Sequence, residues 1–143
     1  MIQVLIKQAI DRPAAEVFAF LADASNNPKW QKGMVSCRWT DEGPIQVGAH
    51  YQQEARFLGC AIVSKFVVTE LIEGRSISIK TVESTFPIQV TRSVEKTPTG
   101  CVAIAEVSGE PSGIFKLLGP LMRPMLESSV KKDYRRLREL LED

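Results

Sequence analysis

The sequence predicts an α+β fold in which the helices are segregated from a predominantly antiparallel sheet. The hydrophobic pattern starts with period two, turns helical, returns to a series of short strand-like runs, and ends helical over residues 112–143. The chain has 143 residues, of which 44% are hydrophobic and 24% charged, which is the size and balance of one globular domain. We therefore expect a single domain spanning residues 1–143.

The chain opens with a strand followed by a helix. Residues 2–10 (IQVLIKQAI) alternate as a strand does, and residues 11–23 (DRPAAEVFAFLAD) change to helical spacing. Asp11 is expected to act as the N-cap, and Pro13 lies in the first turn, where its missing N–H costs little. The SNNP stretch at 25–28 is a turn or a second short helix before the sequence returns to strands.

Six strand-like runs follow, separated by the breaks EGP, FLG, IEGR, STFP and TPTG. Each run is long enough to form a hairpin with its neighbour, so we expect a curved antiparallel meander of about seven strands in total. The six runs span residues 35–42, 49–57, 61–71, 76–84, 88–96 and 101–109.

The last segment predicts a long helix. One apolar stripe recurs at helical spacing and consists of Leu126, Val130, Tyr134, Leu137 and Leu141. Gly119, Pro120 and Pro124 interrupt the first half of the segment, which predicts a kink or a separate short helix there. A curved sheet wrapped around this helix would leave an apolar concavity, the kind of place where small ligands bind.

Charge and cysteine content exclude several classes of protein. Lys and Arg number 18 against 17 Asp and Glu, so a net charge of +1 gives no field that would attract nucleic acid. The three cysteines are an odd number without close spacing and no secretory signal is recognisable, which favours reduced thiols in a cytoplasm. No window approaches about eighteen apolar residues, so no stable membrane insertion is expected.

Several stretches resemble the START and Bet v 1-like superfamily (SRPBCC), in particular its polyketide cyclase/dehydrase and lipid-transport group. The resemblance covers nearly the whole chain and rests on RPAAEVFAFLAD, NNPKW, VGAHYQ, FVVTELIEGRSISI, GEPSG and LRELLED. It implies a helix-grip fold, with a curved sheet around a long C-terminal helix and two short helices between the first two strands. It also implies a monomer or homodimer that binds or transports a hydrophobic, lipid- or polyketide-like molecule in an internal cavity.

No catalytic signature accompanies these motifs, which favours binding over catalysis. The alternative is a cyclase or dehydratase that acts without a cofactor on a ligand in the same cavity, and a third possibility is an interaction module with a vestigial cavity. CxxC, HExxH, GxGxxG and GxxxxGK are all absent from the sequence, so neither a metal nor a dinucleotide cofactor is expected.

Alternation in GAHYQQEARF orders one strand into two faces. It places Tyr51, Gln53, Ala55 and Phe57 inward and His50, the chain's one histidine, on the outer polar face. A histidine exposed in this way gives no support to a His-based triad or metal site. The inward polar groups could orient a ligand or could bond to neighbouring protein groups.

Three further residues raise alternatives of their own. Arg92 and Glu106 each alternate with apolar residues, so they could form a buried ion pair, bind a polar part of the ligand, or face solvent. Trp30 is expected to line the cavity entrance, or else to pack in the core. The apolar stretch around Leu118 could form a cavity wall, a membrane-touching lip or part of the core. The candidate ligand-binding residues are Trp30, Tyr51, Gln53, Ala55, Phe57, Phe66, Val90, Arg92, Leu118 and Met122.

Overall fold

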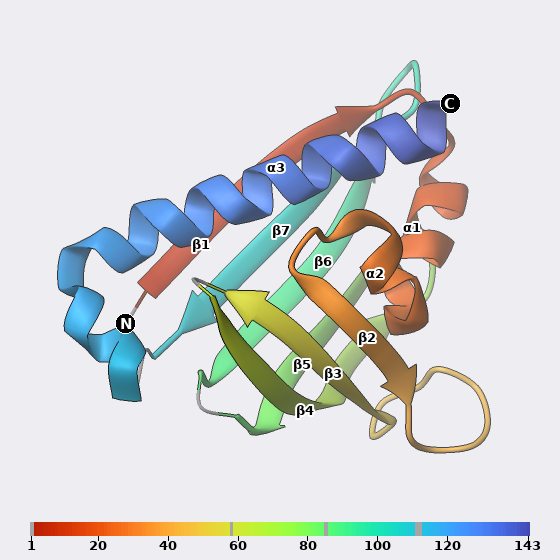
Figure 1. Ribbon diagram of the computed structural model, residues 1–143. Coiled ribbons are helices and arrows are strands. Elements are labelled where there is room, and N and C mark those ends of the chain that lie inside the picture. The colour runs from red at the N-terminus through yellow and green to blue at the C-terminus, as the bar shows by residue number, and fades with distance from the viewer. Residues whose placement is uncertain (1, 58, 85, 111–112) are drawn as a thin grey trace.

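A seven-stranded antiparallel sheet wraps around one long helix (Figure 1). The computed structural model describes residues 2–57, 59–84, 86–110 and 113–143. The strands lie in the order β1-β7-β6-β5-β4-β3-β2, so that the meander from β2 to β7 is completed by β1 at the edge next to β7. The predicted helix-grip fold is therefore confirmed. The strands are β1 (Ile2–Ile10), β2 (Met34–Trp39), β3 (His50–Phe57), β4 (Cys60–Ile72), β5 (Ser76–Glu83), β6 (Ile88–Lys96) and β7 (Cys101–Gly109).

Helix α1 (Ala14–Ala22) covers the sheet with its apolar face, which consists of Ala14, Val17, Phe18 and Leu21. The prediction that Asp11 caps this helix was wrong. Pro13 has an extended backbone and occupies the N-cap position, which leaves Asp11 too far from the first helical turn. The backbone N–H of Asp11 instead donates to Glu142 Oε2 at 2.9 Å and so joins the start of the chain to its end.

The SNNP stretch is helical rather than an open turn. A short 3₁₀ helix, η1 (Ala24–Asn26), leads directly into the single turn α2 (Asn27–Trp30), with Pro28 in the first turn where its missing N–H is tolerated. Asp23 starts the pair, since its carboxylate accepts the backbone N–H of Ser25 at 3.0 Å. This compact unit delivers Trp30 to the interior.

The C-terminal segment divides as predicted into a short helix, η2 (Gly113–Leu121), and the long helix α3 (Met122–Glu142). A kink within η2 falls at Gly119, whose φ of 52° suits a residue without a side chain, directly before Pro120. Pro124 does not interrupt α3, because it lies in the first turn, where helix N–H groups lack partners in any case. Figure 1 shows α3 running alongside β1 over the concave side of the sheet.

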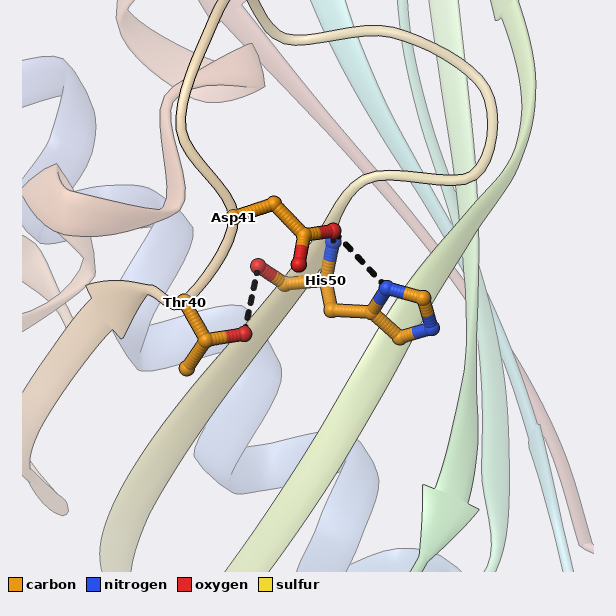
Figure 2. Close-up of polar contacts among 3 residues, drawn as sticks. All are labelled: Thr40, Asp41 and His50. Carbon is orange, nitrogen blue, oxygen red and sulfur yellow. Dashed lines mark hydrogen bonds and ion pairs between the residues drawn. The ribbon is translucent and has the colours of Figure 1, made fainter.

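The loop between β2 and β3 begins earlier than the sequence predicts, because β2 ends at Trp39. Figure 2 shows the cause: Asp41 turns back to accept the His50 ring nitrogen Nδ1 at 2.8 Å, while the hydroxyl of Thr40 donates to the His50 carbonyl. Asp41 also accepts the backbone N–H of His50, and these bonds hold the pKa of its carboxyl below the usual range. His50 is exposed, as predicted, and serves to close this loop.

The close approach of the backbone at Gly100, just before β7, to the end of β1 can be tested by its effect on stability. A Cβ at Gly100 would lie 2.3 Å from the carbonyl oxygen of Ile10, so the Gly100→Ala variant requires a backbone shift at the β1 end. We expect it to lower the free energy of unfolding by about 1–3 kcal/mol in urea denaturation. Thr99→Ala, at the exposed neighbouring position, is the control and should change stability little. Equal stability of the two variants would contradict this close approach.

Candidate ligand-binding cavity

A cavity of about 200 Å³ lies between the concave face of the sheet and helices α2 and α3. Its size exceeds that of a dry apolar cavity of about 150 Å³ that can hold a benzene molecule. Most of the lining side chains are aliphatic or aromatic, and they come from β3 to β7, α2 and α3. The lining includes eight of the ten residues singled out in the sequence, namely Trp30, Tyr51, Gln53, Ala55, Phe57, Phe66, Val90 and Arg92.

The residues of β3 that face inward are those that the alternation predicts. Tyr51 is buried and stacks on Phe66 of β4 with ring centroids 5.0 Å apart, and the Tyr51 ring also meets that of Trp39 edge to face at 5.2 Å. Gln53, Ala55 and Phe57 continue this row along the cavity wall. The aromatic cluster thus forms a rigid apolar floor on one side of the cavity.

Leu118 and Met122 lie outside the lining of this cavity. Met122 is fully buried and packs with Phe86 in a separate apolar cluster, to which Leu118 contributes a partly buried side chain. Met122 thereby supports Phe86, which does line the cavity. Leu117 of η2 is 87% exposed, and residues 111–115 of the same stretch lie outside those whose side chains are described.

Arg92 is the buried cationic group of the cavity and is only 7% exposed. Its Nη1 donates to the carbonyl oxygen of Leu21 at 3.1 Å and to Asn27 Oδ1 at 2.9 Å. Its guanidinium carbon lies 5.1 Å from the centroid of the Trp30 ring, within the range of a cation–π contact. One side chain of β6 thus binds the end of α1 and both ends of α2.

An ion pair between Arg92 and Glu106, one of the alternatives that the sequence leaves open, does not form. In the register of β6 and β7, Arg92 lies opposite Ala105 and Glu106 lies opposite Thr91. Residues directly opposite each other share a face of the sheet, so Glu106 projects from the face opposite to that of Arg92. Glu106 is exposed there and lines a shallow polar groove with Arg123.

Trp30 lines the cavity as a buried wall rather than at a partly wet entrance, since only 1% of the residue is exposed. Its ring meets that of Tyr134 edge to face, with centroids 5.0 Å apart. Within the part of the chain that the structure describes, the Trp30 indole nitrogen and the Tyr134 hydroxyl are fully buried without a hydrogen-bond partner. Such orphaned groups are uncommon in folded proteins.

Asp133 is the acidic residue of the lining and already has protein partners. Its Oδ1 accepts Arg136 Nη1 at 2.8 Å and the backbone N–H of Lys32 at 3.2 Å. Burial nevertheless raises the pKa of this carboxyl above its usual value, although the hydrogen bonds and the charge of Arg92 act in the opposite direction.

The sequence candidates miss many residues of this arrangement, including four that contribute polar side chains. They are Asn27, Ser64, Asp133 and Tyr134. Ser64 could have been found, because it falls in the same alternating row of β4 as Phe66 and is buried there. Asn27 and Asp133 gave no such signal, since their roles depend on contacts with Arg92 and Arg136 that only the tertiary structure creates.

Among the described residues, no group of three or more His, Cys, Asp or Glu side chains could hold a metal ion. No helix in the described part of the chain is long and apolar enough to cross a membrane.

A curved sheet gripping a long helix around an internal cavity defines the class of small-molecule-binding helix-grip proteins. The chain belongs to the polyketide cyclase / dehydrase and lipid transport family, whose model matches residues 1–142. The search of curated proteins gave no match.

Solved structures share the fold at low sequence identity. A START superfamily protein from Mycobacterium smegmatis aligns with a TM-score of 0.84 and 13% identity, over 98% of this chain and 97% of that one. The protein TTHA0849 from Thermus thermophilus aligns with a TM-score of 0.83 and 15% identity, over 96% and 94%. The di-domain ARO/CYC StfQ from the steffimycin biosynthetic pathway aligns with a TM-score of 0.78 and 13% identity, over 99% of this chain and 50% of that one.

The two tyrosines of the chain test the dryness of the cavity. Both are fully buried, and burial raises the pKa of Tyr134 to about 12 and that of Tyr51 still further. The folded protein should therefore show no tyrosinate absorbance near pH 10, where an exposed tyrosine titrates. Because the unfolded chain loses these protons first, stability should be unaffected below about pH 10 and fall above it.

The control for this titration is the same protein in denaturant, in which both phenols should titrate near pH 10. If one tyrosine ionised at that pH while the near-ultraviolet circular dichroism stayed native, its ring would be in contact with solvent. This result would contradict the burial of both tyrosines.

Proposed function

We propose that the protein binds a small, largely apolar molecule in the cavity between sheet and α3, and that it sequesters or carries this molecule. The observation that carries the proposal is a cavity with mostly apolar walls that a few polar side chains, Gln53, Ser64 and Arg92 among them, also line. Apolar concavities with a few converging polar groups are the usual form of a small-molecule site. The family to which the chain belongs includes lipid transport in its description and supports the same function.

The cavity volume sets the size of the proposed ligand. At about 200 Å³ it accommodates a single ring or a medium-length alkyl chain better than a fused polycyclic polyketide. We propose that one domain, residues 1–143, holds the ligand as a monomer or homodimer. A cytoplasmic location is consistent with Cys37, Cys60 and Cys101, which are all free thiols.

Octanamide, a neutral amphipathic molecule of suitable length, tests this binding. We expect saturable binding in isothermal titration calorimetry. The Ala55→Trp variant fills the cavity wall and should abolish most of the heat, although overpacking can itself cost about 1–3 kcal/mol of stability.

The matched control for Ala55→Trp is the same replacement at Ala61, an exposed position on the neighbouring strand β4, and a second control is His50→Gln on the outer face. Both should bind octanamide as the wild type does. Unchanged affinity in a folded Ala55→Trp protein would place the binding site elsewhere, and loss of binding in His50→Gln would contradict the assignment of the inner face.

One observation favours a second candidate function, a cyclase-type enzyme. Asp133 lines the cavity with a raised pKa, which suits a group that takes a proton from a carbon next to a carbonyl. The similarity to StfQ, described as a di-domain ARO/CYC protein of a biosynthetic pathway, is compatible with this candidate.

Proton exchange in a β-diketone tests the enzymatic candidate. With nonane-4,6-dione in deuterated water, an enzyme of this kind should accelerate deuterium incorporation between the carbonyls, as followed by NMR. Asp133→Asn should remove the acceleration, and Glu106→Gln on the outer face should retain it. If the wild type and Asp133→Asn both give the exchange rate of the buffer without protein, binding alone is the function.

A further inference from the structure

We infer that the end of the cavity formed by Arg92, Trp30 and Tyr134 is a receptor for a carboxylate, so that the preferred ligand is a small apolar acid. This inference rests on the proposed binding function and adds the chemical class of the ligand. It follows from the unused donors of Arg92 and from the charge balance of the cavity.

Arg92 has one edge occupied by the protein and one edge unused. A guanidinium carries five N–H donors, and the two on Nη1 meet the carbonyl of Leu21 and Oδ1 of Asn27. Within the described residues, Nε and Nη2 donate no hydrogen bond. Neither atom is fully enclosed, because the fully enclosed side-chain atoms without a partner do not include them. These two nitrogens therefore retain contact with open space, and Arg92 lines the cavity. The Nε and Nη2 edge is a fork that matches the two oxygens of a carboxylate.

The charge of Arg92 is not balanced by an ion pair in the described part of the chain. Its partners there are a backbone carbonyl, an amide and an aromatic face, all of them neutral. Asp133, the acid of the lining, is already bonded to Arg136 and to a backbone N–H. A buried cation without a counterion is costly, and an anionic ligand would relieve this cost.

Aromatic rings beside Arg92 enclose this end of the cavity. The Trp30 ring lies 5.1 Å from the guanidinium carbon, and the Tyr134 ring lies 5.0 Å from that of Trp30. The indole nitrogen of Trp30 and the hydroxyl of Tyr134 are fully enclosed, so they do not reach a ligand in the open cavity. The donors that face a carboxylate there are therefore those of Arg92.

The rest of the cavity is suited to an apolar body. Phe57, Ile62, Phe86 and Ile88 line it and pack around the cluster of Met122. An alkyl chain of medium length or a single substituted ring fits the volume of about 200 Å³. The ligand class is therefore a small carboxylic acid with an aliphatic or aromatic body.

Three ligands that differ mainly in the head group test the inference by calorimetry at neutral pH. We expect octanoate to bind roughly tenfold or more tightly than octanamide, because charge-assisted bidentate bonds are about twice as strong as neutral ones. Octylamine should bind most weakly of the three. The preference for octanoate should also decrease at high salt to a limited extent only, since a buried pair is poorly screened.

Variants assign the preference to this end of the cavity. Arg92→Gln should remove the preference for octanoate while octanamide still binds. Because this variant also loses bonds to α1 and α2, Arg92→Lys is the second test: it keeps the charge and loses the fork, and should reduce the preference in part. Arg38→Gln, at an exposed position on β2, is the control and should retain the full preference.

The outcomes separate this inference from the proposed function. Equal affinities for octanoate and octanamide in the wild type would overturn the carboxylate receptor and leave apolar binding intact. A full octanoate preference in a folded Arg92→Lys protein would overturn the assignment to Arg92. If none of the three ligands bound the wild type, both the inference and the proposed function would fail.

Discussion

The buried guanidinium of Arg92 joins helices α1 and α2 to strand β6 in the interior of the sheet. Arg92 of β6 donates to the Leu21 carbonyl in the last turn of α1, where helix carbonyls lack intrahelical partners and a positive charge is favourable. The same nitrogen donates to Asn27, the first residue of α2, and the guanidinium lies over Trp30, its last. The positions of η1, α2 and the cavity wall therefore depend on a single side chain that is distant in sequence.

Stability alone is a weak reason for such an arrangement. Buried charges are costly to desolvate, and replacing a buried polar cluster by apolar residues of similar size is often neutral or stabilising. Among the described residues, the same cluster leaves one edge of the guanidinium without a protein partner at the wall of an apolar cavity. An unused charged donor of this kind has little value for folding and considerable value for orienting a ligand, which links the architecture to the proposed function.

The alternation of single strands was enough to predict much of this site. Period two along β3 places Tyr51, Gln53, Ala55 and Phe57 on one face whatever the neighbours are, and this row lines the cavity. The relation between strands was not predictable in the same way. Glu106 alternates with apolar residues just as Arg92 does, but the register of β6 and β7 sends it to the opposite face. Local signals also failed where tertiary contacts decide: Trp30 was expected at an entrance, whereas Arg92 and Tyr134 enclose it.

The central claim is that Arg92 is held by the protein through Nη1 and offers Nε and Nη2 to the cavity. Nitrogen NMR of the arginine side chains tests it directly, with the Arg92 signals assigned by comparison with Arg92→Lys. We expect separate Nη1 and Nη2 resonances in the free protein, because the two bonds from Nη1 hinder rotation, and octanoate should shift Nε and Nη2 while moving Nη1 little. A single averaged Nη resonance like that of an exposed arginine, unchanged by saturating octanoate, would contradict the account.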